Sequence, residues 1–210
     1  MNMSQFTVIG LTGGSGSGKG EAARVLAAHG IPSLNTDEVS RLVCQKGWSC
    51  LEELTDAFGD GILLPDGTLN RQKLAGIVFG EPDPDLRAQK LNTLNSITHR
   101  YILDYCRHWL GERREAGCRA ACIDAPQLFE SGFDRECDLI IGICADKDIR
   151  IRRICQRDGI TYEKACQRID AQYDDRFFAE HCDVMIENNG STDALAAALT
   201  DVLLRYSLCS

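Results

Sequence analysis

The sequence predicts an α/β fold in which helices cover both faces of a parallel five-stranded sheet, and three observations carry this prediction. Five short segments are almost continuously apolar, as expected for parallel strands that are buried on both faces. Segments with helical periodicity separate them, which favours right-handed crossover connections. A glycine-rich stretch, residues 13–19, directly follows the first apolar segment and precedes a helical one.

The five predicted strands are spread over the whole chain. They are Phe6–Leu11, Ile31–Asn35, Ala120–Ala125, Asp138–Ala145 and Asp183–Asn188. The long gap between the second and third contains short amphipathic pieces and one long helical pattern over residues 83–117. Asp83 or Asp85 can cap the start of this long helix and Gly117 can end it. We expect residues 37–117 to form a helical insertion that faces a substrate.

Composition limits the class of protein. The 210 residues are 44% hydrophobic and 26% charged, which is typical of a soluble globular chain. The net charge of −8 argues against general nucleic-acid binding. No apolar run approaches the ~20 residues that cross a bilayer, and the N-terminus has no export signal. We therefore expect a cytoplasmic protein, a monomer or small homo-oligomer, with a small-molecule substrate and neither membrane nor nucleic-acid partners.

Cysteine is unusually frequent, with eleven residues, but the pattern is uninformative. The number is odd, and no Cys-x-x-Cys or cysteine–histidine ligand pattern occurs. We expect reduced thiols that serve as small core residues; an oxidation-sensitive surface or an unusual metal site are the alternatives.

The segment Gly13–Lys19 fits the phosphate-loop pattern G-x-x-x-x-G-K between a strand and a helix. Glycines 13, 14, 16 and 18 should adopt positive φ and turn their N–H groups inward, beside the positive end of the next helix. Lys19 would add a full charge for the β- and γ-phosphates of ATP. The expected nucleotide contacts are Gly13, Gly14, Ser15, Gly16, Ser17, Gly18, Lys19, Gly20 and Glu21.

The residues after the lysine depart from this pattern. Gly20 stands where a Ser or Thr hydroxyl usually coordinates Mg²⁺, so the cradle remains and one direct metal contact is lost. Because Mg²⁺ readily keeps several waters, it can be held by phosphate oxygens and water instead. Glu21 would repel the α-phosphate unless it points away or binds a metal-bound water.

Two carboxylates end predicted strands, where α/β folds bind ligands. Asp37 could accept the proton of an attacking hydroxyl, or it could merely cap a helix that starts at Glu38, and the local pattern favours the cap. Asp124 is a candidate to orient the waters or ligands of a magnesium ion.

A basic stripe follows the fourth predicted strand. Arg150, Arg153 and Arg157 share one helix face, either as phosphate contacts or as a solvated surface, and we expect Arg153 to act in catalysis. Residues 158–181 should form a lid, in which Phe177 and Phe178 more simply pack than stack on adenine. Asn188 or Asn189 after the last strand could contact the adenine base.

Several segments together resemble the dephospho-coenzyme A kinase family, which has a P-loop kinase fold. The first is "TVIGLTGGSGSGKG", continuing to "IPSLNTDEV"; then follow "LLPDGTLNRQKLAGIVF", "LNSITHRYI", "IDAPQLFESG", "QRDGIT", "RIDAQ" and "DVMIENNGS". They occur in family order and span almost the whole chain. The resemblance implies ATP- and Mg²⁺-dependent phosphorylation of the 3′-hydroxyl of dephospho-coenzyme A, the last step of coenzyme A biosynthesis.

The resemblance also implies residue roles and a division of the chain. Asp37 matches the family's proposed base, and Arg71 matches a basic position that binds the acceptor, although it could also simply begin a helix. His99 could face the acceptor or complete a core. The core would comprise approximately residues 1–36, 118–157 and 182–210, the acceptor-binding insertion 37–117 and the lid 158–181.

The chain is an atypical variant of this family. Gly20 and Glu21 replace Ser-Thr after the lysine, Asn35 replaces an aspartate, and Arg100 replaces the proline after the family histidine. Two alternatives therefore remain: a catalytically weak regulatory paralogue that binds nucleotides, or a kinase of another small nucleotide or nucleoside.

Overall fold

A computed structural model describes residues 6–209 and divides the chain into two compact units. Thr36–His108 form one unit, and the rest of the described chain forms the other; the boundary falls inside one long helix. The expected absence of an export signal concerns mainly residues 1–5, which lie outside the described range. Within that range, no helix combines the length and apolar character of a bilayer-spanning segment.

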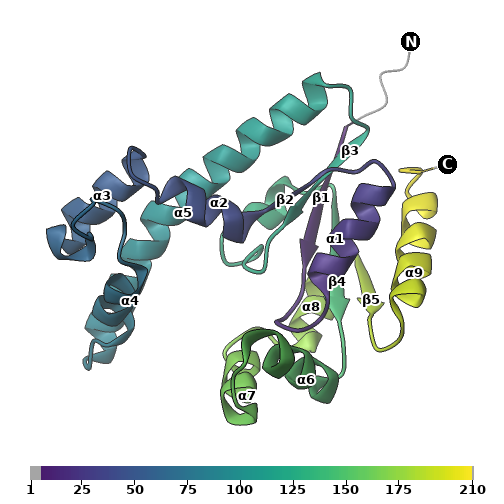
Figure 1. The fold of residues 1–210 in the computed structure, drawn as a ribbon. Coiled ribbons are helices and arrows are strands. Elements are labelled where there is room, and N and C mark those ends of the chain that lie inside the picture. Colours follow the sequence, from purple (N-terminus) through teal and green to yellow (C-terminus); the bar gives the residue numbers. More distant parts are fainter. Residues whose placement is uncertain (1–5, 210) are drawn as a thin grey trace. The chain divides into compact units, whose positions relative to one another are not determined.

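The larger unit contains the predicted parallel sheet, so the expected fold class is confirmed (Figure 1). Its strands are β1 (Thr7–Thr12), β2 (Ser33–Asn35), β3 (Ala120–Asp124), β4 (Leu139–Cys144) and β5 (Val184–Glu187), in the order β2-β3-β1-β4-β5. All four pairings are parallel, and each strand coincides with one of the apolar segments. Because β1 is central, the loop that follows it opens at the middle of the sheet's carboxyl edge.

Aspartates just before β4 and β5 fix the register of these strands. Asp138 accepts a hydrogen bond from the backbone N–H of Val8 at 2.8 Å, and Asp183 accepts one from Ile140 at 2.7 Å. Each carboxylate therefore satisfies an amide of the neighbouring strand where the ladder begins.

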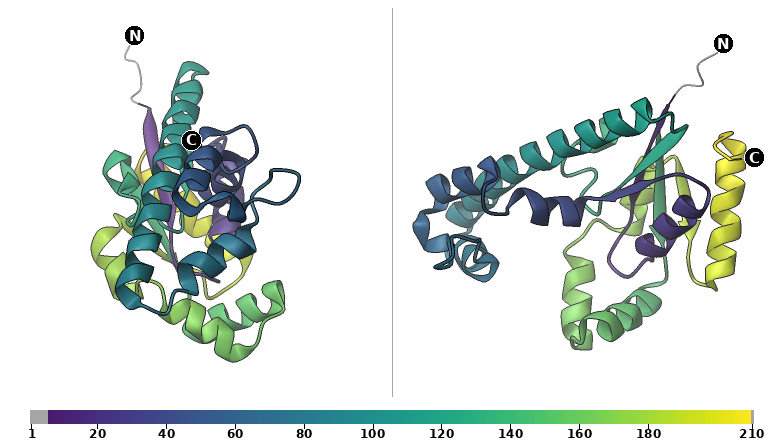
Figure 2. Two further views of the ribbon diagram at one scale, coloured as in Figure 1. Left: turned by 90° about the vertical axis from the view of Figure 1, so that its left-hand side faces the viewer. Right: turned by 45° about the horizontal axis from the view of Figure 1, so that its top comes forward.

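Helices α1 (Lys19–Ala28) and α9 (Thr192–Arg205) pack together on one face of the sheet (Figures 1 and 2). The main core lies beneath them. It includes Ile9 and Leu11 of β1, Leu26 of α1 and Leu199 of α9, all fully buried. Alternate residues of β1 face the other side, where a Cβ on Gly10 would lie 2.8 Å from the Cys137 sulfur. That close approach explains a glycine in a central strand.

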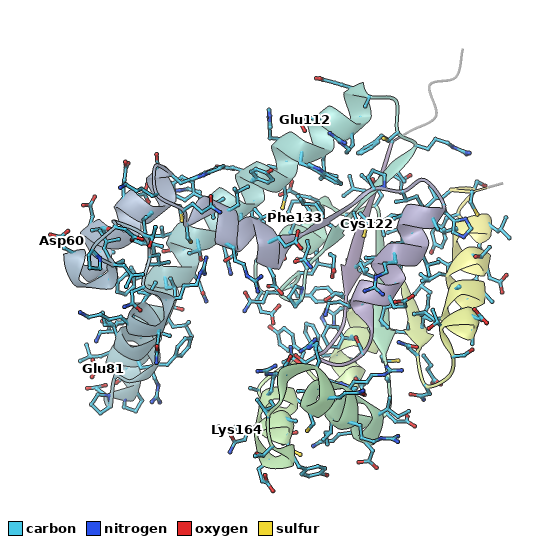
Figure 3. The ribbon with its side chains drawn as sticks, viewed as in Figure 1. Asp60, Glu81, Glu112, Cys122, Phe133 and Lys164 are labelled. Atoms are coloured by element: carbon cyan, nitrogen blue, oxygen red, sulfur yellow. The ribbon has the colours of Figure 1, made fainter. Side chains whose placement is uncertain are left out.

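The loop after β3 covers this second side of the sheet. It leads into the short helix η2 (Phe133–Glu136), and the side chain of Phe133 is fully buried. Figure 3 shows Phe133 and Cys122 at the sheet, whereas Lys164 extends outward from its helix.

Two helices, α7 (Tyr162–Asp170) and α8 (Asp175–His181), form the segment 158–181 that is expected to act as a lid. Helix α6 (Lys147–Asp158) directly precedes this segment. Ile151 and Ile154 of α6 pack against Ala165 and Ile169 of α7 in a small apolar cluster. Helix α8 packs against β4 and β5.

The aromatic residues of α8 serve packing, as predicted. Phe177 lies between two rings, with centroid distances of 3.8 Å to Tyr173 and 4.1 Å to His181. Its edge meets Phe129 from the loop after β3 at 5.2 Å, and Phe178 is buried. Phe177 is thus occupied by protein rings on both faces.

The second unit is helical, as the periodicity predicts. It contains α2 (Thr36–Val43), α3 (Ser49–Phe58), the short η1 (Asp60–Ile62), α4 (Arg71–Phe79) and most of α5 (Pro84–Glu115). Of the two candidate caps, Asp83 starts α5 by accepting the N–H groups of Asp85 and Leu86. Gly117, at φ 78°, lies just beyond the helix end.

Three contacts tie α5 to α3 and to the residue that precedes it within this unit. Trp48 and Tyr105 pack with ring centroids 6.2 Å apart, and Tyr101 donates a 2.6 Å hydrogen bond to Glu53. Arg100 pairs with the same carboxylate. The residue that replaces the family proline therefore contributes to helix packing.

Candidate active site

The loop between β1 and α1 has the backbone that a phosphate cradle needs. Gly13, Gly16 and Gly18 have φ of 136°, 78° and 104°, which L side chains rarely adopt. Gly18 precedes α1 directly, so the helix begins at Lys19 with its first amides directed toward the loop.

Gly14 differs from the other three, and the prediction of positive φ for all four glycines is wrong at this position. The reason for glycine here is space. A Cβ on Gly14 would lie 2.1 Å from Nη2 of Arg150, a separation that atoms do not tolerate. Sequence alone could not distinguish a conformational glycine from one that is contacted by a distant arginine.

Side chains hold the carbonyl groups at both ends of the loop. Lys19 donates from Nζ to the Gly13 carbonyl at 2.8 Å. At the other end, Nδ2 of the buried Asn188 donates to the Ser17 carbonyl at 2.8 Å. A Cβ on Gly18 would lie 2.0 Å from the same Nδ2 atom. The residue expected near adenine thus contacts the loop backbone, while Asn189 pairs with Asp146.

Two arginines of α6 hold the carbonyls in between. Arg150 donates from Nε to Ser15 at 2.9 Å, and Arg153 donates from Nη1 to Gly16 and Ser17 at 3.3 Å each. Arg153 also donates from Nη2 to the Asn188 carbonyl at 3.0 Å. Arg150 and Arg153 thus both reach the loop from one face of α6, and a shared face is what their spacing predicts.

Arg157, the third arginine of the stripe, has a different partner. It forms two hydrogen bonds with Asp158, at 2.7 and 2.8 Å, and Arg168 of α7 bonds to the same carboxylate. These hydrogen bonds, that from Arg157 foremost, lower the pKa of Asp158 to about 2. The carboxylate therefore stays ionised and keeps two guanidinium groups together.

Sequence reasoning missed two further residues, one that contacts the loop and one that contacts Arg150. Gln172, in the turn between α7 and α8, accepts the N–H of Ser15 at 2.7 Å. Asp175, at the start of α8, pairs with Nη1 of Arg150 at 3.4 Å. These contacts join residues 157 and 25 positions apart, so no local pattern signals them.

The two unusual residues after Lys19 have permissive surroundings. A Cβ at Gly20 would have no atom within 4 Å, so a larger residue would fit. Glu21 pairs with Arg24 one turn later on α1, and this charge neutralisation reduces the repulsion expected toward a phosphate.

Polar side chains mark the carboxyl ends of β2 and β3. Asn35 and Asp124 are register partners there, and Asp124 is buried at 6% exposure. The chain then enters α2 at Thr36, which places Asp37 in the first helical turn. The alternative in which Asp37 caps a helix starting at Glu38 is therefore wrong, because the helix begins earlier. A carboxylate in a first turn still interacts favourably with the helix dipole.

In the helical unit, Arg71 is the first residue of α4. Its Nη2 lies 3.4 Å from the Ser40 carbonyl and 3.5 Å from that of Arg41, near the end of α2. His99 lies half-buried on α5. Both candidate acceptor contacts thus belong to this unit.

Arg71 also affects a pair of thiols. The eleven cysteines, all of which lie within residues 6–209, are thiols rather than disulfides, and the sulfurs of Cys44 and Cys50 lie 3.9 Å apart. The hydrogen bond from Cys50, together with the positive charge of Arg71, lowers the pKa of Cys44 to about 7. The expected use of cysteine as a core residue holds for the buried Cys44, Cys50, Cys106 and Cys122.

The comparisons with known proteins point to one family. A family model described as dephospho-CoA kinase matches residues 7–194. The chain belongs to the dephospho-CoA kinase family. A dephospho-CoA kinase of Corynebacterium efficiens is 38% identical over 189 residues, which cover 90% of this chain and 92% of that protein.

Solved structures agree with the fold. A crystal structure from Thermus thermophilus superimposes with a TM-score of 0.76 at 28% identity and covers 95% of this chain and 97% of its own. A Campylobacter jejuni dephospho-CoA kinase gives 0.70 at 22% identity, with 97% and 98% covered, and therefore supports the fold. The resemblance inferred from the sequence motifs and the kinase class are thus confirmed.

Proposed function

We propose that the chain transfers the γ-phosphoryl group of ATP to the ribose 3′-hydroxyl of dephospho-CoA. The observation that carries this proposal is the family match over residues 7–194. The phosphate loop supports it independently, since its backbone has the conformation that such a transfer requires. The reaction breaks the bond between the γ-phosphorus and the β–γ bridging oxygen, forms a bond to the 3′-oxygen, and releases ADP.

On the donor side, the loop amides and Lys19 would bind the β- and γ-phosphates. Lys19 lies within 2.8 Å of a loop carbonyl and can exchange that partner for a phosphate oxygen by rotating its flexible side chain. Arg153, also at the loop, would stabilise the negative charge that develops during transfer. Arg157 would contribute from the C-terminal end of α6, where Asp158 orients it.

On the acceptor side, Asp37 would accept the proton of the 3′-hydroxyl as the new P–O bond forms. Its place directly after β2 puts it in the chain segment that leaves the carboxyl edge of the sheet. Arg71 would pair with a phosphate of the acceptor, and His99 would contact the same molecule.

Magnesium fits this site as an ion with few protein ligands. Among residues 6–209, no three His, Cys, Asp or Glu side chains gather in a way that would hold a metal. Asp124 could orient water around the ion from the end of β3, and Gly20 offers no hydroxyl. Mg²⁺ bound to phosphate oxygens would neutralise charge on the transferred group.

We further propose that the enzyme works in the cytoplasm on this small-molecule acceptor, as a monomer or small homo-oligomer. The family match supports the substrate class.

The decisive test is acceptor-dependent turnover. Purified protein with ATP and Mg²⁺ should release ADP rapidly only when dephospho-CoA is added. The product should carry its new phosphate at the 3′ position, as phosphorus NMR can establish. Adenosine and AMP serve as control acceptors; equal rates with them would favour a kinase of another nucleotide or nucleoside.

Two sequence features favour a second candidate, a weakly catalytic regulatory paralogue. Gly20 lacks the metal-binding hydroxyl, and the sheet edge carries Asn35 in place of a carboxylate. MgATP binding without acceptor-dependent ADP release would support this alternative and contradict the kinase assignment.

A further inference from the structure

Arg150 is the most deeply buried charged group near the phosphate loop. The residue is 4% exposed, although it lies on a helix whose neighbouring arginine, Arg152, faces solvent. Burying a guanidinium is costly unless its donors are used. The burial of Arg150 therefore needs a structural reason, because a role in attracting phosphate would not require the side chain to be buried.

Three parts of the guanidinium meet three parts of the chain. Nε donates to the Ser15 carbonyl at 2.9 Å, and Nη1 pairs with Asp175 at 3.4 Å. Nη2 is buried, has no hydrogen-bond partner among the described residues, and lies where a Cβ of Gly14 would be. The planar group thus fills the outer side of the loop at Gly14 and Ser15.

The hydrogen bond from Arg150 to the Ser15 carbonyl also determines the direction of the next backbone N–H group. In a trans peptide the C=O and the following N–H point in opposite directions. Because Arg150 holds the Ser15 carbonyl on the outside, the N–H of Gly16 must point to the inside of the loop. Arg153 has the same effect through the Ser17 carbonyl, whose partner amide belongs to Gly18. Arg153 also binds the Gly16 carbonyl, but the amide of that peptide, the Ser17 N–H, donates within the loop to the Gly14 carbonyl at 3.1 Å.

The peptide group between Gly14 and Ser15 is fixed as well. The N–H of Ser15 donates to Oε1 of Gln172 at 2.7 Å. Both polar backbone groups of Ser15 are therefore held by side chains from the α6–α8 segment. Asp175 connects Arg150 to the beginning of α8 and completes this three-residue contact.

We propose that Arg150 is a positioning residue of the phosphate loop, which with Gln172 and Asp175 fixes the two peptide planes around Ser15 so that the N–H of Gly16 faces the phosphates of ATP. This inference rests on the proposed function. It assigns Arg150 a different role from the direct phosphate contact expected from its place in the arginine stripe. The requirement is for guanidinium geometry, since a point charge could not make the same contacts.

The test compares nucleotide affinities of Arg150→Met and Arg150→Lys with the wild type, using calorimetric titration with MgATP and MgADP. Both variants should weaken both nucleotides by a similar factor, on the order of tenfold, because the amides serve the β-phosphate that ATP and ADP share. In the kinase assay, kcat/KM for ATP should fall on the order of 10²-fold while KM for dephospho-CoA stays unchanged. Arg152→Gln, on the same helix but exposed, is the matched control.

Three outcomes would overturn the proposal. Restoration by Arg150→Lys would show that charge alone matters. A loss confined to ATP, with ADP unaffected, would make Arg150 a γ-phosphate ligand. Unchanged affinity in both variants would show that the contact is dispensable.

Folding and the proposed function are controlled separately. If Arg150→Met does not fold, Asp175→Asn and Gln172→Ala test the same assembly; each should weaken both nucleotides by a similar factor, and no change in either would overturn the proposal. If wild-type protein binds no MgATP, the proposed function fails, whereas normal wild-type binding with unaffected variants removes only the role of Arg150.

Discussion

The phosphate loop and the helical unit Thr36–His108 hold their candidate site residues in contrasting ways. The loop is fixed by side chains that are distant in sequence, through hydrogen bonds mostly of 2.7–2.9 Å. In the helical unit, Arg71 is exposed and reaches two backbone carbonyls of α2 at long distances of 3.4 and 3.5 Å.

This difference matches the demands of the two ligands. Phosphoryl transfer depends on positioning and electrostatics, so the donor site gains most from groups that are fixed in advance. A large flexible acceptor can instead be met by side chains that change partners on binding. We therefore expect substitutions at the loop to reduce turnover, and substitutions in the helical unit to change mainly acceptor affinity.

The largest effect is expected for Lys19→Ala. Removing the only full charge within the loop should lower kcat/KM for ATP by about 10³-fold, since a preorganised donor to the developing charge is lost. Steady-state kinetics measures this effect, and thermal unfolding verifies the fold. Lys164→Ala, an exposed lysine on α7, is the control. Comparable losses in both variants would contradict a specific role for Lys19.

Asp37→Asn should have the second-largest effect, a fall in kcat of about 10²-fold, because the amide cannot accept the hydroxyl proton. MgATP affinity by calorimetry should remain that of the wild type. The adjacent Glu38→Gln is the matched control. Normal turnover in Asp37→Asn would remove its catalytic role and assign the carboxylate to the helix dipole alone.

Arg71→Ala tests the helical unit, where we expect a change in acceptor affinity. KM for dephospho-CoA should rise by about tenfold through loss of one charge-assisted contact, with KM for ATP unchanged. Arg87→Ala, an exposed arginine of α5, should change neither constant. If KM for ATP rose instead, the assignment of Arg71 to the acceptor would be wrong.

Gly20→Ser should improve the enzyme slightly. The position has open space, so the hydroxyl can be added without a clash, and the Mg²⁺ concentration for half-maximal rate should fall roughly threefold. The helix should also gain about 0.5 kcal/mol of stability. Gly20→Ala would share the stability gain without the metal effect; an identical magnesium response in both variants would argue against a direct contact.

The smallest effect concerns Asp158. Its pKa in the folded protein, about 2, lies below the ordinary 3.8, so its pairing stabilises the fold above about pH 4 and this contribution is lost as the pH falls toward 2. The difference in unfolding midpoint between wild type and Asp158→Asn should therefore shrink between pH 5 and pH 3. A difference that stays constant with pH would rule out the ion pairs with Arg157 and Arg168 as its cause.

The sheet and the loop could be predicted because their signals are local. Each strand is an uninterrupted apolar segment, and the glycines, lysine and following helix of the loop lie within a few positions of one another. The helix spacing of Arg150 and Arg153 likewise predicted a shared face, which the loop contacts confirm.

The partners of those arginines could not be predicted. Whether Arg150 meets a phosphate or a carbonyl depends on the packing of α6 against the loop. The role of Gln172 depends on a turn 157 residues from Ser15. The reason for glycine at position 14 could not be predicted either, because the space there is occupied by the side chain of Arg150, which is distant in sequence.

Helix α6 presents two different sides, and this has a mechanical consequence. One side forms hydrogen bonds to the loop through two guanidinium groups, and the other packs against α7 through apolar side chains. We therefore expect a displacement of α7 to move α6 and, with it, the loop backbone that we propose binds the triphosphate. A compound that bound between α6 and α7 would then loosen the hydrogen bonds that position the loop backbone, without occupying the nucleotide site itself.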